Sequence, residues 1–438
     1  MMQLNAYLDT FWDLVTRENR ADTGTLIGVP RPYLIPAADP SNPMFQEMYY
    51  WDSYFIALGV IDTRHEQRVI DMAENMAYLI ERFGFVPNGT RYYFTSRSQP
   101  PFFTRLVRLA HAIVKKNAPH DETAFLKRML AAAIREHDGF WMNETLPPGY
   151  RRIVKLETAR ENVEIPVHPN DSALSTQHSA LNRYADVNAL HIMASCESGW
   201  DHSARCGGDI AGGEAGRWLD YVPVCLNSIL YVAENDIAEM AEMLGNIALS
   251  EEWRKIAQAR AQTMQTIFWH EDHGFFYDYN WVEKRPNFHA SLAGFYPLWA
   301  GWATQAQAND IVNRWLPQFL AEGGLLTSLS TSNNHQWATP NGWAPLQWLV
   351  TEGLDRYGYM NEANDIRQRW CQTCEDGFKR DHTLLEKYNV IKPNTPPAHG
   401  VYGTVKGFGW TNGVYINFKK RLSVLNTTSD INNIYGKN

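Results

Sequence analysis

The chain has 438 residues, of which 45% are hydrophobic and 20% are charged. These fractions are close to those of globular proteins and exclude a disordered or collagen-like chain. The 40 Lys and Arg residues and 48 Asp and Glu residues give a net charge of −8, so a polyanion such as a nucleic acid is a poor partner. No stretch approaches the ~18 consecutive apolar residues that suggest a transmembrane helix, and we expect no membrane association.

Cysteine usage and the N-terminal stretch bear on the cellular compartment. The chain has 5 Cys residues, and the CxxC of Cys371 and Cys374 has no second pair with which to complete a zinc site. We therefore expect no disulfide framework, no metal and no cofactor, and free thiols favour a cytoplasmic location. The stretch 1–20 lacks a basic start and is interrupted by Asp and Arg, which predicts an amphipathic helix rather than a signal peptide.

Most of the chain shows the hydrophobic period of helices. In 66–83, apolar residues recur on one face, and Gly84 follows as a stop signal. The same pattern predicts further helices at 122 onward, 226–245, 252–268, 304–316, 345–357 and 360–378. Strand-like alternation is scarce, and the segment 274–280 (GFFYDYN) is the best candidate, as one arm of a hairpin.

The predicted fold is therefore all-α. About twelve helices would each occupy, together with a loop, ~36 residues, which suits helices of ordinary length. Twelve helices in two concentric rings make an (α/α)6 barrel, and the spacing alone also permits an α-solenoid, although we find no fixed-period repeat of that kind. No Ser-, Gly- or Pro-rich linker divides the chain, so we predict a single domain over 1–438, with the helix at about 1–20 packing on it.

The loops between these helices combine aromatic and polar residues, a composition typical of sites carried by a rigid scaffold. In the first such loop, Asp52 lies between Trp51 and Tyr54. Its carboxylate could accept hydrogen bonds from two sugar hydroxyls while Trp51 stacks on the sugar. The alternative is that Asp52 is the N-cap of a helix from Ser53 onward.

A second, Pro-bounded loop at 87–103 contains Asn88, Arg91, Arg97 and Gln99. Together these side chains offer hydrogen-bond donors and acceptors, as recognition of hydroxyl groups requires. The alternative is that they satisfy backbone groups of the loop itself.

Two further loop carboxyls are candidates for acid–base chemistry. Asp201 follows Gly199 and Trp200, and a carboxyl beside an indole can lose solvent and stay protonated as a general acid, unless it serves only as an N-cap. Glu386 stands in an apolar segment next to Lys387, although a lone loop Glu is usually solvated. Glycoside hydrolysis needs one acid to protonate the leaving oxygen and one carboxylate on the other face of the sugar, and the sequence leaves the distance between these two open.

Motifs of other enzyme classes are missing. His168, His178, His191 and His202 share a region without HxxxH or HExxH spacing, so a zinc site is not expected. The sequence contains no P-loop, no GxGxxG opening a βαβ unit and no GxSxG elbow, so kinase, dehydrogenase and α/β-hydrolase functions lack support.

Six loop segments together resemble the α,α-trehalases of glycoside hydrolase family 37. They are YYWDSYF, RSQPPFF, SGWDHSAR, QWATPNGWAPLQW, EKYNV and GFGWTNGV, in the family's order from about residue 43 to residue 414. The resemblance implies an (α/α)6 barrel and inverting, metal-independent hydrolysis, with Asp201 of SGWD as the general acid and Glu386 of EKY as the general base. The sugar-binding positions that it implies are Phe45, Tyr49, Trp51, Asp52, Asn88, Arg97, Gln99 and Trp337.

The chain departs from the family pattern at several charged positions. Met44 and His168 stand where the family has Arg, and Asn170, Ala338 and Val401 stand where it has an acidic residue. Each lost charged hydrogen bond would weaken sugar binding by roughly 1.5–3 kcal/mol, unless a neighbouring arginine replaces it. The arginines considered for this replacement are Arg91, Arg160 and Arg183.

We therefore expect a monomeric, inverting glycoside hydrolase that cleaves the α-glycosidic bond of trehalose or of another small α-glycoside such as glucosylglycerate. The second substrate class follows from YYWDSYF and ESGWD, which are also similar to the sister glycoside hydrolase family 63. The missing charges favour a changed subsite and a poorer fit to trehalose. The alternative is a catalytically weak, trehalase-like sugar-binding or regulatory protein, and the retention of both catalytic acids argues against it.

Overall fold

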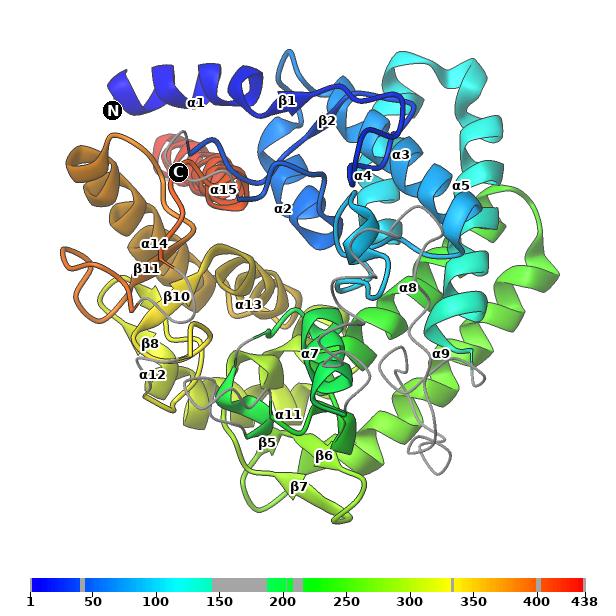
Figure 1. Ribbon diagram of the computed structural model, residues 1–438. Helices are drawn as coiled ribbons and strands as arrows, with labels where there is room; N and C mark the ends of the chain where they lie inside the picture. The colour runs from blue at the N-terminus through cyan, green and yellow to red at the C-terminus, as the bar shows by residue number, and fades with distance from the viewer. Residues whose placement is uncertain are drawn as a thin grey trace.

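The helices of this chain form a closed ring. The computed structural model describes residues 2–39, 44–143, 187–201, 203–207, 216–331, 335–398 and 403–435. Within these residues, six helices contact one another in a circle (Figure 1). In order around the circle they are α2 (Tyr50–Val60), α4 (Phe103–Asn117), α8 (Val224–Met243), α10 (Tyr296–Ala300), α13 (Ala344–Arg356) and α15 (Gly409–Tyr435), which returns to α2.

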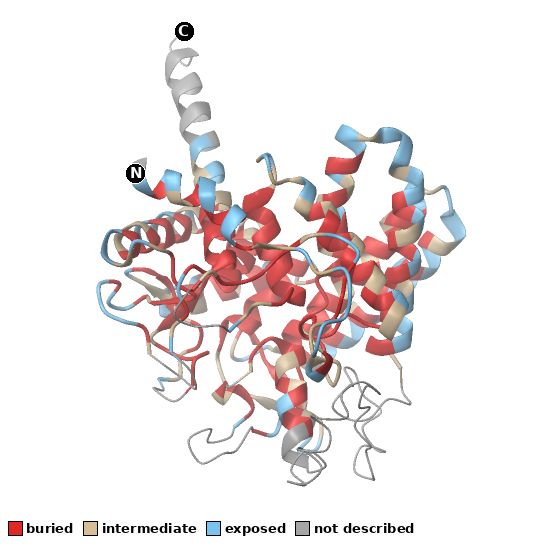
Figure 2. Ribbon diagram, turned by 45° about the horizontal axis from the view of Figure 1, so that its top comes forward, coloured by how far each residue is buried: buried red, intermediate tan, exposed pale blue. Residues whose placement is uncertain are grey.

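A second layer of helices packs around this ring. These are α3 (Gln67–Phe83) on α2 and α4, α5 (Glu122–Glu136) on α4 and α8, α9 (Ile247–Phe268) on α8, and α14 (Met360–Asp381) on α13 and α15. The outer helices expose one side to solvent while the centre of the ring is buried (Figure 2). Two concentric helical layers confirm the predicted all-α (α/α)6 barrel.

The predicted helices occur close to their expected bounds, with one exception. The stretch predicted at 304–316 is divided into α11 (Gln305–Asp310), a π-helical turn (Ile311–Trp315) and α12 (Leu316–Phe319). Pro317 explains the division, because proline has no backbone N–H to donate to the carbonyl four residues earlier.

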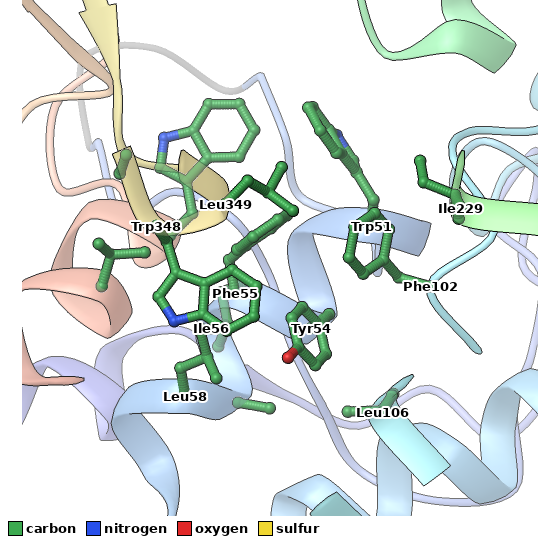
Figure 3. Close-up of a cluster of buried hydrophobic side chains, with 14 of the residues drawn as sticks. Trp51, Tyr54, Phe55, Ile56, Leu58, Phe102, Leu106, Ile229, Trp348 and Leu349 are labelled. Atoms are coloured by element: carbon green, nitrogen blue, oxygen red, sulfur yellow. The ribbon is translucent and has the colours of Figure 1, made fainter. Parts of the chain in front are cut away.

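The ring closes through an unusually near approach of α15 to α2. A Cβ atom added to Gly413 would lie 2.1 Å from the carbonyl oxygen of Phe55, and one added to Gly59 would lie 2.6 Å from the Cα atom of Gly413. Only glycine fits at such a backbone contact. Next to it, Trp51, Tyr54, Phe55, Phe102 and Trp348 form part of the buried aromatic core (Figure 3).

The N-terminal helix α1 (Met2–Leu14) lies against the barrel. Its apolar face buries Leu4, Leu8 and Phe11. On the same helix, the Tyr7 ring lies 5.2 Å from that of Phe378 at the end of α14. Nowhere in the described part of the chain is a helix long and apolar enough to cross a membrane.

The strands of the described residues are two or three residues long and lie in the loops. Four antiparallel pairs are β1–β2 (Thr16–Arg17, Tyr33–Leu34), β4–β5 (Trp269–His270, Phe275–Phe276), β8–β9 (Leu320–Ala321, Gly324–Leu325) and β10–β11 (Asn341–Trp343, Lys387–Asn389). A three-stranded sheet has the order β3–β6–β7 (Tyr221–Val222, Asp278–Asn280, Arg285–Asn287). The segment predicted as a hairpin arm at 274–280 forms β5 and β6.

Candidate active site

Asp52 is a buried carboxyl at the start of the first ring helix. α2 begins at Tyr50 with Tyr49 as its N-cap residue, so Asp52 lies inside the first turn, and its interpretation as an N-cap is wrong. Burial, and to a lesser extent the neighbouring carboxyls of Glu386 and Asp201, raise the pKa of Asp52 to about 8. Asp52 is therefore mostly protonated at neutral pH and is able to donate a hydrogen bond.

The three carboxyls thus share one site although their loops are far apart in the sequence. Asp52 comes from α2, Asp201 from the loop after α7 (Val187–Ser198), and Glu386 from the residue before β11. Asp201 and Glu386 both act electrostatically on Asp52, so two acids that are 185 residues apart in the sequence lie near the same carboxyl.

Glu386 is held rigidly in the interior. Its side chain is 1% exposed, which contradicts the alternative of a solvated loop residue. Its backbone N–H donates to the carbonyl of Val405 at 2.9 Å, and its own carbonyl accepts from Trp410 Nε1 at 2.9 Å. The ammonium group of Lys387 lies 2.9 Å from Glu386 Oε2.

Asp201 occupies the turn that leaves α7. Gly199 makes this turn with a φ of +76°, and a Cβ atom there would lie 2.7 Å from Pro100 Cγ. The indole Nε1 of Trp337 donates to Asp201 Oδ1 at 3.3 Å. The short helical turn that follows is capped by the side chain of Ser203, so Asp201 is not its N-cap.

A buried ion pair fixes the loop that carries Asp201. Arg205 Nε donates to Asp278 Oδ2 at 2.6 Å, a second nitrogen binds Oδ1, and the two side chains are 0% and 3% exposed. The guanidinium lies 4.8 Å from the ring centre of Trp200, the residue before Asp201. Asp278 belongs to β6, so the small sheet anchors the loop through a bidentate charge pair.

Four tryptophan rings lie in contact with one another beside these carboxyls. Trp337 stacks on Trp343 with centroids 4.0 Å apart and an interplanar angle of 13°. Its ring also lies 6.0 Å from that of Trp51 and 5.5 Å from that of Trp200. The four indoles are at most 2% exposed and form a continuous apolar wall beside these carboxyls.

The remaining predicted binding residues surround the same place. Gln99 hydrogen bonds to the Asp52 carboxyl and accepts from the backbone N–H of Trp51 at 3.3 Å. The Asn88 N–H donates to the carbonyl of Arg97 at 2.9 Å, which shapes the second loop. The Arg97 guanidinium lies 5.0 Å from the ring centre of Phe94.

Phe45 and Tyr49 form the aromatic edge of this group. Their ring centroids are 5.4 Å apart, and Phe45 has a φ of +61°, a conformation that is costly outside glycine and is typical of functional sites. Burial raises the pKa of Tyr49 well above its usual value; the charge of Asp52 also raises it, and that of Arg97 lowers it. Both rings therefore lie with the other candidate residues.

The departures from the family pattern have different environments. Met44 is 39% exposed, whereas Ala338 is 1% exposed next to Trp337. Arg91, one proposed substitute for the missing charges, binds Glu47 through Nε and donates from Nη1 to Thr25 Oγ1 at 2.9 Å. His168, Asn170, Val401, Arg160 and Arg183 lie outside the described residues.

Arg205, Lys387 and Trp343 have no role in the expectations drawn from the sequence. All three lie inside the motifs that resemble the trehalase family, and their place in these motifs is the sequence signal that could have identified them. Across the described residues, no group of three or more His, Cys, Asp or Glu side chains is arranged as metal ligands.

Curated relatives cover nearly the whole chain. The periplasmic trehalase of Citrobacter koseri is 34% identical over 425 residues, 94% of this chain and 72% of the relative. That of Escherichia coli O1:K1 is 33% identical over 94% of this chain and 73% of the relative. Their names point to the periplasm, so our prediction of a cytoplasmic location is wrong.

The prediction of a cytoplasmic location failed because free thiols carry little information about the compartment. Cys206, Cys225, Cys371 and Cys374 are buried, and burial raises their pKa. A buried, protonated thiol is unreactive and needs no reducing environment to stay free.

Solved structures agree with the relatives. The neutral trehalase from Saccharomyces cerevisiae matches with a TM-score of 0.71 and 28% identity over 89% of this chain and 73% of that chain. A family 63 mannosylglycerate hydrolase from Thermus thermophilus matches with a TM-score of 0.60 and 16% identity, over 95% of this chain and 100% of that chain, which shows a common fold. A family model described as Trehalase matches residues 2–423. The chain is therefore a glycoside hydrolase and belongs to the trehalase family.

Proposed function

We propose that this enzyme hydrolyses the α-glycosidic bond of trehalose with inversion of configuration. The observation that carries the proposal is the meeting of Asp52, Asp201 and Glu386 in one tryptophan-lined site, where Asp52 and Glu386 are buried. Glycoside hydrolysis uses two carboxyls, and the third is available to bind the sugar. The names of the curated relatives support trehalose as the substrate.

In this mechanism Asp201 is the general acid and Glu386 is the general base. Asp201 protonates the glycosidic oxygen as the bond to the anomeric carbon breaks, and Glu386 takes a proton from the water that attacks the opposite face. The Trp337 indole positions the Asp201 carboxyl, and the charge of Lys387 supports an ionised Glu386. The oxocarbenium-like transition state forms between them, where the indoles keep bulk water away.

The residues Phe45, Tyr49, Trp51, Asp52, Asn88, Arg97, Gln99 and Trp337 bind the sugar in this proposal. Neutral Asp52 would donate to a sugar oxygen, and Gln99 offers both a donor and an acceptor. We also propose that residues 1–438 act as one monomeric catalytic domain, since a single chain completes both the ring and the site. Sedimentation in solution tests the monomer.

Another small α-glycoside, such as glucosylglycerate, is the second candidate substrate. Its support is the pair of observations that Ala338 places a methyl group in the buried site and that Arg91 is engaged by Glu47 and Thr25. A subsite with fewer charged groups would suit a leaving group with fewer hydroxyls than glucose.

A panel of α-glycosides tests these proposals, with the released anomer followed by NMR. Trehalose leading the panel by ~100-fold in kcat/KM, about 2.7 kcal/mol of transition-state binding, would reject the changed subsite. Asp201→Asn and Glu386→Gln should each reduce turnover by ~10²–10⁴-fold with unchanged circular dichroism. Near-normal turnover in either variant would refute the assignment, and sugar binding without turnover in the unmodified chain would identify a binding protein instead.

A further inference from the structure

The ammonium group of Lys387 and the carboxylate of Glu386 are among the most deeply buried charges of the described residues. Lys387 Nζ lies 2.9 Å from Glu386 Oε2, and the side chains are 0% and 1% exposed. An isolated charge at such a depth is strongly unfavourable, so each ion requires compensation by the other. The pair therefore links the proposed general base to a fixed positive charge.

The local backbone makes this contact between neighbours in the sequence. Successive side chains of a strand point to opposite faces, so two adjacent strand residues do not form an ion pair. Here β11 begins at Lys387, and Glu386 lies in a bend just before it. The bend allows both side chains to meet, and the Glu386 backbone is fixed by hydrogen bonds to Val405 and Trp410.

The opposite strand holds the ammonium group from its other side. In the antiparallel register of β10 and β11, Trp343 lies directly across from Lys387. Lys387 Nζ is 5.0 Å from the centre of the Trp343 ring, a cation–π contact. Trp343 stacks on Trp337, and Trp337 donates to Asp201.

We propose that Lys387 is a positioning residue that keeps the Glu386 carboxylate charged and in place, and that Trp343 and Trp337 couple it mechanically to Asp201. One continuous set of contacts then fixes both the base and the acid. This inference rests on the proposed function, in which Glu386 is the base.

Other charged groups also lie near Glu386. Two of them are carboxyls, whose charge would oppose the effect of Lys387, and one is a lysine at the surface. Asp52 and Asp201 share its electrostatic environment, and each disfavours a negative charge on Glu386 when it is itself ionised. Lys406, whose segment bridges to Leu385, has an exposed side chain, and its N–H donates to Asp39 Oδ2 at 3.3 Å. Lys387 is a cation in direct contact with Glu386, so its removal takes a positive charge away from the carboxylate.

The experiment is a pH profile of kcat and KM for the full chain and its Lys387 variants. Lys387→Met removes the charge, and Lys387→Gln removes it while keeping a donor for Glu386. Lys387→Arg keeps the charge. Lys379→Met is the matched control, because Lys379 also pairs with a carboxylate, Asp376 at 2.7 Å, on the exposed surface of α14.

The acid limb of kcat should move to higher pH by about one to three units in both neutral variants, because an adjacent opposite charge stabilises the ionised base by that amount. Activity should fall strongly in acid and recover in alkali, with KM little changed. Lys387→Arg and Lys379→Met should keep the acid limb of the unmodified enzyme.

An unshifted acid limb in folded Lys387→Met and Lys387→Gln would overturn the inference, as would an equal loss of kcat at every pH. If the Met variant fails to fold, the Gln variant decides; failure of both to fold while the Arg variant folds would make Lys387 a folding residue and also refute the role. The proposed function fails differently: the unmodified chain would cleave no α-glycoside, or Glu386→Gln would retain full activity.

Discussion

Replacement of Asp52 by Asn should make the protein more stable at neutral pH. The ordinary pKa of an aspartate is 3.8, and burial raises the pKa of Asp52 in the folded protein to about 8. When such an acid is buried, unfolding lets it ionise, so it opposes folding at every pH above its unfolded pKa. The opposing contribution is absent below pH 3.8, grows as the pH rises, and levels off near pH 8.

The magnitude follows from the difference between the pH and the unfolded pKa. At pH 7 the difference is 7 − 3.8 = 3.2 units, which corresponds to about 4 kcal/mol at 1.36 kcal/mol per unit. At pH 4.5 the same calculation leaves about 1 kcal/mol. Asn does not ionise, has nearly the same shape and still accepts from Gln99, so Asp52→Asn should gain most of this stability while it weakens sugar binding.

Urea unfolding followed by tryptophan fluorescence at pH 7 and pH 4.5 measures both values. Asp62→Asn is the control, because Asp62 is 67% exposed and its φ of +62° is one that Asn also adopts. This control should change stability little at either pH. A variant at position 52 that is no more stable at pH 7, or whose gain does not shrink towards pH 4.5, would refute the reasoning.

Three further predictions concern the scaffold of the site. Arg205→Met should destabilise the protein by about 3–5 kcal/mol, because it leaves Asp278 buried without its partner, and adding Asp278→Asn should recover part of the urea midpoint. Gly199→Ala should cost ~1–2 kcal/mol of backbone strain and also lower kcat/KM, since its Cβ would press on Pro100. Gly358→Ala, where φ is +86° with nothing within 4 Å, should cost the strain alone and leave kcat/KM unchanged. In a crystal structure with bound inhibitor, the carboxyls of Asp201 and Glu386 should lie about 6.5–9.5 Å apart, and about 5 Å would indicate a retaining mechanism instead.

The helical layers could be predicted from the sequence because their signal is local. The segment 66–83 places its apolar residues on one face, and Gly84 takes the left-handed conformation that ends α3. The break within the stretch predicted at 304–316 was missed, although its cause is equally local, since proline at 317 is incompatible with a continuous helix. Such features depend only on residues within a few turns of each other.

The interior of the site could be predicted only in part, because it depends on contacts between distant segments. β10 and β11 have three residues each, too few for a strand pattern, yet their register puts Trp343 against Lys387. Sequence reasoning also treats a lone loop Glu as solvated, whereas Glu386 is buried by residues from β11 and α15. The family resemblance identified the two catalytic candidates. The side chains that contact and hold them could be identified only from the three-dimensional structure.

Three carboxyls in one site require three different means of compensation, since like charges cannot all ionise side by side. Burial keeps Asp52 protonated, the Lys387 ammonium balances Glu386, and the Trp337 indole donates to Asp201. The differences match the roles proposed for them: a neutral donor to sugar, a charged base, and an acid that exchanges its proton with the leaving oxygen. Chemically similar groups are thus distinguished by their surroundings, as the different roles proposed for them require.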